Sequence, residues 1–321
     1  MGPVRVLVTG SSGFIGSHLA ARLKAGGHWV RGADIVPPPR DAGLDEFAHG
    51  DLRLPGWCEF AADGVDHVYH LAADMGGMGY ISGNHAEIFR SNTLMDVHML
   101  AAAAAAGVSR FLYASSACVY PQALQDSPGA PPLREEAAFT GPPPMEAYGW
   151  AKLYGELGCR WHAGGGLAIR IARLHNVYGP HGTWDGGREK APAALCRKVA
   201  LADPDGTVEV WGDGQQARSY CYIDDATEGL LRVMAGSHPG AVNVGSDFLI
   251  TTAGLVSLIA RVAGKPRLRI RQVPGPQGVR GRCSDNTLAR LVLGWEPSVP
   301  LEDGLKVTYE WIRGELGERA R

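Results

Sequence analysis

Short apolar runs alternate, along the first half of the chain, with segments whose apolar residues recur at helical spacing. The apolar runs are typical of buried strands and occupy 4–8, 29–35, 65–73, 111–115 and 167–173. Helical spacing is found over 11–24, and again over about 91–106, where Gly107 gives a good C-terminal stop. Strands and helices that alternate at this interval predict an α/β fold, a doubly wound parallel sheet with helices on both faces.

The second half of the chain continues this pattern less regularly. Residues 121–144 are rich in proline and small residues and predict a long surface loop, after which a helix contains Tyr148 and Lys152. Further strands are expected at 208–210 and 241–244, and further helices beginning near Pro192, at 251 and at 301. No repeat and no clean linker is visible, so we expect a smaller α/β region laid over the C-terminal ends of the sheet.

Composition narrows the class of protein. With 321 residues, of which 45% are hydrophobic, the chain can bury a sizeable core. A formal net charge of −2 gives no overall positive field, so neither nucleic acid nor an anionic membrane is an expected partner. The six cysteines are scattered without a CxxC pair, which predicts reduced thiols and no bound metal.

The location of the protein is predicted from the absence of targeting features. Residues 1–4 lead straight into a strand, without the basic start and apolar stretch of a secretion signal. The most apolar helix, near 94–108, is interrupted by Asp96 and His98 and is too short to span a bilayer. We therefore expect a cytoplasmic protein.

A glycine turn joins the first strand to the first helix. It reads Gly10-Ser-Ser-Gly13-Phe14-Ile15-Gly16. The first glycine permits the tight turn, the second lets backbone N–H groups approach a pyrophosphate, and the third lets helix and strand pack closely. In this position the motif predicts a dinucleotide site of the Rossmann type.

Acidic residues after the second strand indicate which dinucleotide binds. Asp34 can accept hydrogen bonds from the adenosine ribose and would repel a 2′-phosphate, which favours NAD over NADP. Asp51 and Leu52 suit a contact with the adenine edge. We therefore assign residues 1–174 to an NAD-binding Rossmann domain, completed by parts of 218–247, and residues 175–321 to a substrate-binding region.

Candidate catalytic groups follow the fourth strand. Ser115-Ser116 end that strand, and Tyr148 and Lys152 share one helical face because they are four positions apart. A nearby ammonium and the positive nicotinamide would favour tyrosinate, so Tyr148 could act as a base while Ser116 holds a substrate hydroxyl. With the glycine turn, this set resembles the extended short-chain dehydrogenase/reductase family, in which the lysine also binds the nicotinamide ribose.

Several longer segments are more specific within that family. They resemble the GDP-mannose 3,5-epimerase group and read LAADMGGMGY (71–80), SSACVYP (115–121), HNVYGP (175–180), GGREKAP (186–192) and GVRGR (278–282). One departure is Cys283, where a polar residue such as Asn is expected. The resemblance covers nearly the whole chain and implies conversion of GDP-mannose to GDP-L-galactose and GDP-L-gulose, with NAD as cofactor and a homodimeric assembly.

That reaction requires two acid/base groups. Oxidation of the sugar at C4 makes the C–H bonds at C3 and C5 acidic, so a proton is removed from one face and returned to the other before C4 is reduced again. The resemblance assigns the two groups to Cys118 and Lys190. Nearby cations can lower the pKa of a thiol, and desolvation can lower the pKa of a lysine.

Further residues are expected to bind the substrate. Gly76 and Gly77 would let the backbone approach the hexose, beside Ser116, Ala117 and Cys118. The resemblance places Asn176, Glu189 and Lys198 at the substrate. Gln216, Arg218 and Arg280 fit the nucleotide and its diphosphate, since guanidinium pairs well with phosphate oxygens.

Other functions stay open on the sequence alone. A 4,6-dehydratase of the same family usually carries an Asp-Glu pair where this chain has Ala117-Cys118, and a simple 4-epimerase would not require Cys118 and Lys190. A non-catalytic NAD-sensing protein often loses the tyrosine or the lysine, and both are present here. No residue pattern reads guanine rather than another base.

Overall fold

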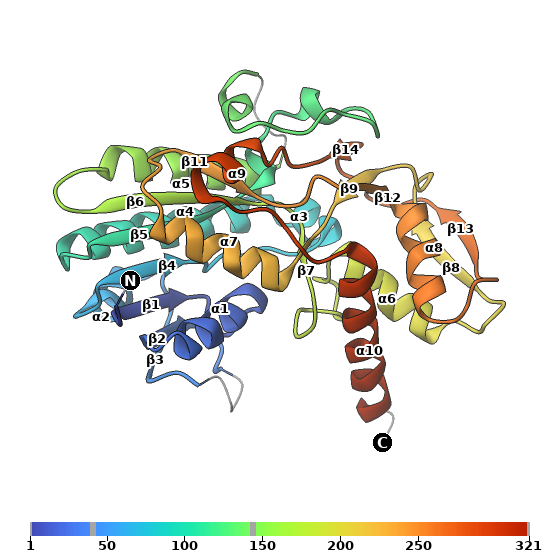
Figure 1. The fold of residues 1–321 in the computed structure, drawn as a ribbon, viewed down its shortest axis with the longest axis horizontal. Helices are drawn as coiled ribbons and strands as arrows, with labels where there is room; N and C mark the ends of the chain where they lie inside the picture. The colour runs from blue at the N-terminus through green and yellow to red at the C-terminus, as the bar shows by residue number, and fades with distance from the viewer. Residues whose placement is uncertain (1, 39–42, 142–145, 320–321) are drawn as a thin grey trace.

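A parallel sheet forms the centre of the protein. The computed structural model describes residues 2–38, 43–141 and 146–319. Seven strands pair in the order β11-β6-β5-β4-β1-β2-β3, every pair parallel, as Figure 1 shows. They are β1 (Arg5–Thr9), β2 (Trp29–Asp34), β3 (Glu46–His49), β4 (His67–His70), β5 (Arg110–Ser116), β6 (Ala168–Leu174) and β11 (Ala241–Val244).

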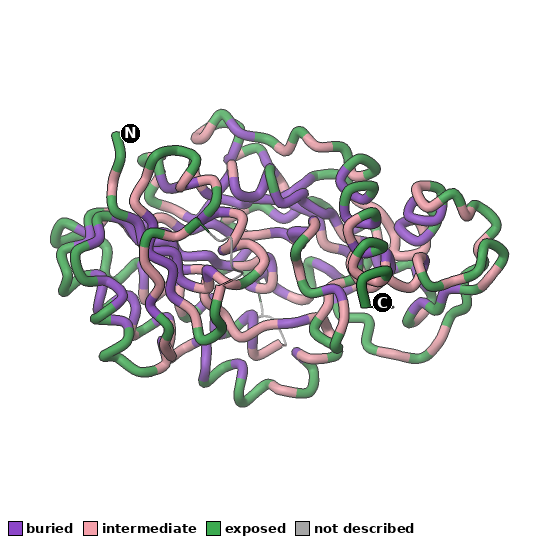
Figure 2. Tube along the Cα trace, turned by 90° about the horizontal axis from the view of Figure 1, so that it is seen from below, coloured by how far each residue is buried: buried purple, intermediate pink, exposed green. Residues whose placement is uncertain are grey.

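Helices cover both faces of this sheet. They are α1 (Phe14–Ala25), α2 (Pro55–Ala62), α4 (His85–Ala105), α5 (Ala147–His162) and α7 (Ile223–Ala235). Alternate residues of one strand enter different cores, since Val6 and Val8 pack with the α1 side while Leu7 packs with the α2 and α4 side. Figure 2 shows the buried residues gathered in the interior of the molecule. The predicted doubly wound α/β fold is confirmed.

Smaller elements follow at the C-terminal ends of the strands. Besides the short α3 (Met78–Gly83), they are β7 (Val177–Tyr178), α6 (Ala191–Leu201), β8 (Thr207–Trp211), β9 (Ala217–Ser219), β10 (Cys221–Tyr222), β12 (Leu249–Thr251), α8 (Thr252–Val262), β13 (Arg269–Val273), β14 (Gly281–Arg282), α9 (Thr287–Leu293) and α10 (Leu301–Arg319). Three small sheets result, β12-β9-β14, β13-β8 and β10-β7. The chain returns to the main sheet at β11 between these pieces, so the division at residue 174 stays a prediction.

Some predicted boundaries differ from the structure. The strand predicted at 65–73 ends at His70, because the chain then enters an irregular glycine-rich segment. The helix predicted from residue 91 begins at His85, and the first helix begins at Phe14 because residues 11–13 belong to the turn.

The predicted surface loop at 121–144 is more ordered than expected. It contains the 3-10 helices η2 (Gln122–Gln125) and η3 (Glu135–Phe139), after η1 (Ala117–Val119), and it buries Leu133 and Ala138 against Val119 and Tyr120. Its last residues, 142–144, lie outside the described residues. Met1, the first of the residues 1–4 that lead into the first predicted strand, also lies outside them. All six cysteines are free thiols. Across the described ranges, no helix is both long enough and apolar enough to cross a membrane.

Candidate functional site

One large cavity lies where the strands of the main sheet end. Its volume is about 1340 Å³, larger than the roughly 300–1,000 Å³ that a drug-sized ligand fills, so it has room for a dinucleotide and a second ligand. Every predicted site residue except Arg280 lines it, namely Gly10, Gly13, Phe14, Ile15, Gly16, Asp34, Asp51, Leu52, Gly76, Gly77, Ser116, Ala117, Cys118, Tyr148, Lys152, Asn176, Glu189, Lys190, Lys198, Gln216 and Arg218.

The glycine turn has the shape expected for a pyrophosphate site. Gly10 has a left-handed φ of 69°, and a Cβ on Gly16 would overlap the carbonyl oxygen of Gly10, so strand and helix approach as closely as glycine allows. The Asp34 carboxylate accepts hydrogen bonds from the backbone N–H groups of Ser12 (3.0 Å) and Val36 (3.1 Å). Each of its oxygens keeps a further lone pair for ribose hydroxyls.

Lys152 carries the strongest local sign of a ligand-binding site. Its side chain is 1% exposed, and its ammonium nitrogen has no hydrogen-bond partner within the described ranges. It lies 4.6 Å from the centroid of the Tyr113 ring. A buried polar group without a partner is costly, and the hydroxyls of a nicotinamide ribose would satisfy this one. The glycine turn, Asp34 and Lys152 therefore fit NAD.

The environment of Tyr148 favours the ionised form of its hydroxyl less than the sequence predicted. It is buried against Ile81 and Ile88, with Cys118 beside it. Burial raises the pKa of its hydroxyl well above the usual value, and Ser116 opposes this only in part. The chain by itself therefore holds Tyr148 as the neutral phenol, and the tyrosinate depends on a positive charge brought in by the cofactor.

Cys118 is in contact with an arginine, Arg282, to which no sequence pattern points. The Arg282 Nη1 donates to the Cys118 Sγ at 3.2 Å. Burial would raise the pKa of this thiol, but the positive charge of Arg282, hydrogen bonds with Ser116 and Arg282, and the charge of Lys190 together lower it below the usual value. The geometry favours a thiolate facing the cavity.

Lys190 is the second predicted acid/base group and is close enough to Cys118 for their charges to interact. It is the N-cap residue of α6. Desolvation lowers the pKa of its ammonium group, while the Cys118 thiolate opposes that shift. Lys190 therefore helps to bring the pKa of Cys118 nearer to neutrality, and it is burial that brings the pKa of Lys190 nearer to it.

Two arginines leave positive charge in the cavity wall. Arg218 donates to the carbonyl oxygens of Ala217 (2.8 Å) and Val279 (2.6 Å), and desolvation together with the charge of Arg282 lowers its pKa to about 10. Neither Arg218 nor Arg282 forms an ion pair with a carboxylate in the described part of the chain. An anion such as a diphosphate would satisfy both.

The placement of Arg280 departs from the prediction. Its guanidinium pairs with the Asp213 carboxylate at 2.8 Å and 3.0 Å and does not line the cavity. Arg282, two residues further on in β14, faces the cavity instead. The RGR motif shows two arginines on alternate positions but carries no local signal that distinguishes them.

The other predicted substrate residues are held by contacts within the chain. Glu189 pairs with Arg197 at 2.8 Å, and the side chains of Asn176, Lys198 and Gln216 donate to the carbonyl oxygens of Ser219, Glu209 and Trp211. The Oε1 of Gln216 is buried and lacks a partner in the described structure. These side chains are fixed in the wall before any ligand is bound.

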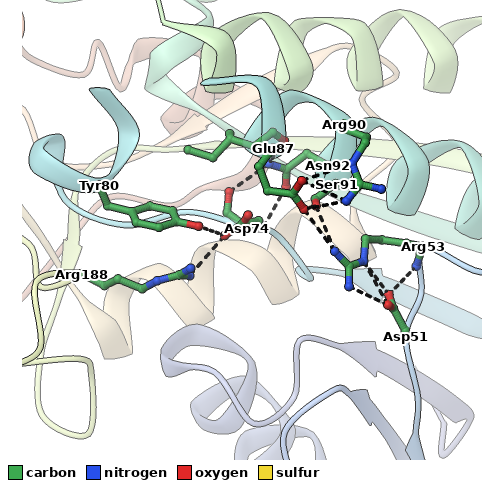
Figure 3. Close-up of polar contacts among 10 residues, drawn as sticks. Asp51, Arg53, Asp74, Tyr80, Glu87, Arg90, Ser91, Asn92 and Arg188 are labelled. Carbon is green, nitrogen blue, oxygen red and sulfur yellow. Dashed lines mark hydrogen bonds and ion pairs between the residues drawn. The ribbon is translucent and has the colours of Figure 1, made fainter. Parts of the chain in front are cut away.

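A chain of polar contacts borders the cavity and was not foreseen from the sequence (Figure 3). At one end, the Asp51 carboxylate accepts from Arg53 at 2.7 Å, and Arg53 also pairs with Glu87 at 3.2 Å. Towards the other end, Asp74 accepts from Arg188 at 3.2 Å. These contacts join residues that are far apart in the sequence, so no local sequence pattern predicts them.

The fold and the cavity define an enzyme of the Rossmann class that binds a dinucleotide beside a second, anionic ligand. The model of the NAD dependent epimerase/dehydratase family matches residues 6–245, and the chain belongs to that family. Its cofactor is NAD, as predicted.

Named relatives share almost the whole chain. A GDP-mannose 3,5-epimerase of Arabidopsis thaliana is 44% identical over 98% of this chain and 83% of its own length. GDP-mannose 3,5-epimerase 1 of Oryza sativa subsp. japonica is also 44% identical, over 98% of this chain and 82% of its own. The solved complex of Thermus thermophilus UDP-glucose 4-epimerase with NAD has a TM-score of 0.82 and 27% identity, and covers 97% of this chain and 99% of that one.

Proposed function

We propose that this protein is an isomerase, a GDP-mannose 3,5-epimerase that forms GDP-L-galactose and GDP-L-gulose. The observation that carries the proposal is that Cys118 and Lys190 line the same cavity as Tyr148 and interact electrostatically there. The similarity to the plant enzymes, at 44% identity, supports the substrate.

The first chemical event takes place at C4 of the sugar. Ser116 holds the C4 hydroxyl, and Tyr148 takes the hydroxyl proton. The glycine turn, Asp34 and Lys152 would hold NAD, which would supply a reversible acceptor for the hydride of C4. Lys152 binds the ribose of the cofactor, and the positive nicotinamide ring that is bound there favours the ionised form of the tyrosine.

Epimerisation follows at the carbons next to the ketone. One of the pair Cys118 and Lys190 removes a proton from C5 or C3, and the other delivers a proton to the opposite face. The lowered pKa of Cys118 and the lowered pKa of Lys190 bring both groups closer to neutrality than the free side chains. Such matching is what a reversible proton exchange requires, because neither direction is then strongly disfavoured.

The nucleotide is bound by the remaining wall of the cavity. Arg218 and Arg282 supply the positive charge for the diphosphate, in place of the predicted pair with Arg280. Lys198, Gln216 and Asn176 lie further along the wall and bind the nucleoside and sugar hydroxyls. Gly76 and Gly77 allow the backbone to approach the hexose.

Proton exchange in D₂O tests this function. The protein is incubated with GDP-mannose and NAD, and deuterium at C3 and C5 is followed by NMR. We expect incorporation at both carbons, and its loss in Cys118→Ala, in Lys190→Ala and in Tyr148→Phe, because the last variant cannot form the ketone. A protein that reacts at C4 alone would instead be a 4-epimerase, and one that incorporates no deuterium and does not reduce NAD would be a non-catalytic NAD-binding protein.

We further propose that the enzyme is a cytoplasmic homodimer. An apolar stripe on α5 contains Trp150, Tyr154 and Trp161, with Tyr154 55% and Trp161 75% exposed. The neighbouring α4 exposes Phe89 and Val97, and the two helices pack side by side. Exposed aromatic residues at helical spacing are typical of an interface between copies of a chain.

The molar mass in solution tests the dimer. We expect the mass of two chains for the unaltered protein and of one chain for Tyr154→Glu, which places a charge within the stripe. Leu291→Glu, at an apolar residue exposed elsewhere on α9, serves as the control and should stay dimeric. A monomer in all three proteins would refute the assembly.

A further inference from the structure

Two irregular segments meet at the cavity wall beside Lys190. One is residues 71–77, before α3, and the other is residues 186–190, before α6. The Gly77 N–H donates to the carbonyl oxygen of Arg188 at 3.0 Å. A Cβ on Gly77 would lie 2.5 Å from the carbonyl oxygen of Glu189, so only glycine permits this approach. The backbones of the two segments are therefore in direct contact.

Side chains also join these two segments at the cavity wall, with Tyr80 of α3 beside them. The Arg188 guanidinium lies 3.2 Å from the Asp74 Oδ1 and stacks over the Tyr80 ring, 3.8 Å from its centroid. The Tyr80 hydroxyl donates to the same Asp74 oxygen at 2.9 Å. Figure 3 shows the three side chains converging. We call Arg188, Asp74 and Tyr80 the Arg188 clasp.

One end of the clasp is anchored in the folded core. Asn92 lies on α4 and is fully buried. Its Oδ1 accepts from the Asp74 N–H at 2.9 Å, and its Nδ2 donates to the Asp74 carbonyl at 2.9 Å. Asp74 is therefore fixed against a helix that packs on the sheet, and Arg188 is tied to that fixed point across 114 positions of sequence.

Lys190 depends on its backbone for its position. No side-chain hydrogen bond or ion pair of Lys190 is found among the residues that the structure describes. On the C-terminal side of Lys190, α6 begins with the next residue. On the N-terminal side, the backbone is held by the ion pair of Glu189 with Arg197 and by the Arg188 clasp. Because catalysis demands placement to within a fraction of an ångström, an untethered base needs a rigid backbone.

We propose that Arg188, Asp74 and Tyr80 are positioning residues that hold the segment 186–190 in place and so aim Lys190 at the sugar. The inference rests on the proposed function, because it takes Lys190 to be one of the two epimerising groups. None of the three acts on the C4 hydroxyl, which belongs to Tyr148 and Ser116. The Arg188 clasp therefore affects proton exchange at C3 and C5 and does not affect oxidation at C4.

The variant Arg188→Gln removes the charge and keeps most of the side-chain length. We expect deuterium exchange at C3 and C5 to fall about 10- to 100-fold, the range that a displacement of about 1 Å causes in a positioned group. The formation of NADH after mixing with saturating GDP-mannose should stay within about twofold of the unaltered protein, since the C4 chemistry uses other residues. Arg188→Lys, which restores the charge towards Asp74, should recover part of the exchange rate.

A second measurement does not depend on turnover. Backbone amide hydrogen exchange of the peptide containing Gly77, whose N–H is bonded to the Arg188 carbonyl oxygen, should accelerate about tenfold in Arg188→Gln when followed by mass spectrometry without substrate, because the contact between the two segments opens locally. The matched control is Arg267→Gln, another exposed arginine with one carboxylate partner, Asp205, which lies outside the cavity lining. It should change neither measurement.

The outcomes separate the clasp from the function it serves. Unchanged amide exchange in Arg188→Gln, or a parallel fall of NADH formation and proton exchange, would overturn the clasp. An unaltered protein that exchanges nothing at C3 and C5 would refute the epimerase function. In that case a faster amide exchange in Arg188→Gln still establishes that the clasp holds the segment.

Discussion

Arg282 is expected to set the charge state of Cys118, and its replacement measures how strongly. The variant Arg282→Gln keeps a polar side chain of similar shape and removes the positive charge that lies 3.2 Å from the Cys118 Sγ. The thiolate is the form that this charge stabilises, so its removal raises the pKa of Cys118. The thiolate fraction at neutral pH then falls, and any activity that needs the thiolate requires a higher pH.

The size of the shift follows from Coulomb's law. Unit charges about 4 Å apart interact by about 4 kcal/mol at an effective dielectric constant of about 20, which corresponds to about 3 pKa units at 1.36 kcal/mol per unit. Lys190 and Ser116 continue to stabilise the thiolate in the variant, and water replaces part of the lost interaction. We therefore expect the pKa to rise by about 1–3 units.

Alkylation by iodoacetamide, measured against pH, reports this pKa directly. Cys118 is the only one of the six cysteines that is not fully buried. Burial also raises the pKa of other cysteine thiols, to about 12 for Cys58 and about 11 for Cys283. Alkylation at neutral pH is therefore selective for Cys118. Peptide mass spectrometry follows Cys118 alone.

The matched control lies two residues away. Arg280→Gln removes an arginine of the same motif that pairs with Asp213 and does not line the cavity. Its labelling profile should match that of the unaltered protein. If the midpoint for Cys118 were the same in Arg282→Gln as in the unaltered protein, the electrostatic account of the thiolate would be wrong.

Three further changes test other parts of the structure. Asp34→Asn should reduce the preference for NAD over NADP by about tenfold or more, as expected when a hydrogen bond to a charged group worth about 1.5–3 kcal/mol is weakened, and titration of the cofactor-free protein with each dinucleotide measures it. Glu156→Gln should lower the free energy of unfolding by about 3–5 kcal/mol in a urea titration, because Arg173, 1% exposed and bound at 2.7 Å, would lose its buried counter-charge. Gly77→Ala should displace the segment that carries Glu189 and slow epimerisation while the melting temperature changes little, and normal turnover in that variant would show that the close backbone approach is dispensable.

Local chain geometry made much of this protein predictable. The glycine turn at Gly10–Gly16 follows from the positive φ and close approach that only glycine allows, and the four-residue spacing of Tyr148 and Lys152 places both on one face of a helix. The alternation of apolar runs and helical segments predicted the parallel sheet. Such features depend on neighbours in the sequence, so the sequence by itself determined the fold class, the cofactor turn and the Tyr–Lys pair.

The tertiary structure alone decided which charged groups meet. Arg282, not Arg280, faces Cys118, across 164 positions of sequence, and Arg188 reaches Asp74 across 114. Contacts between residues so far apart in the sequence depend on how the loops close over the sheet. The residues next to each partner in the sequence therefore do not indicate which contact forms. For the same reason the burial that holds Tyr148 as a phenol, and the solitary ammonium of Lys152, became visible only when the cavity was assembled.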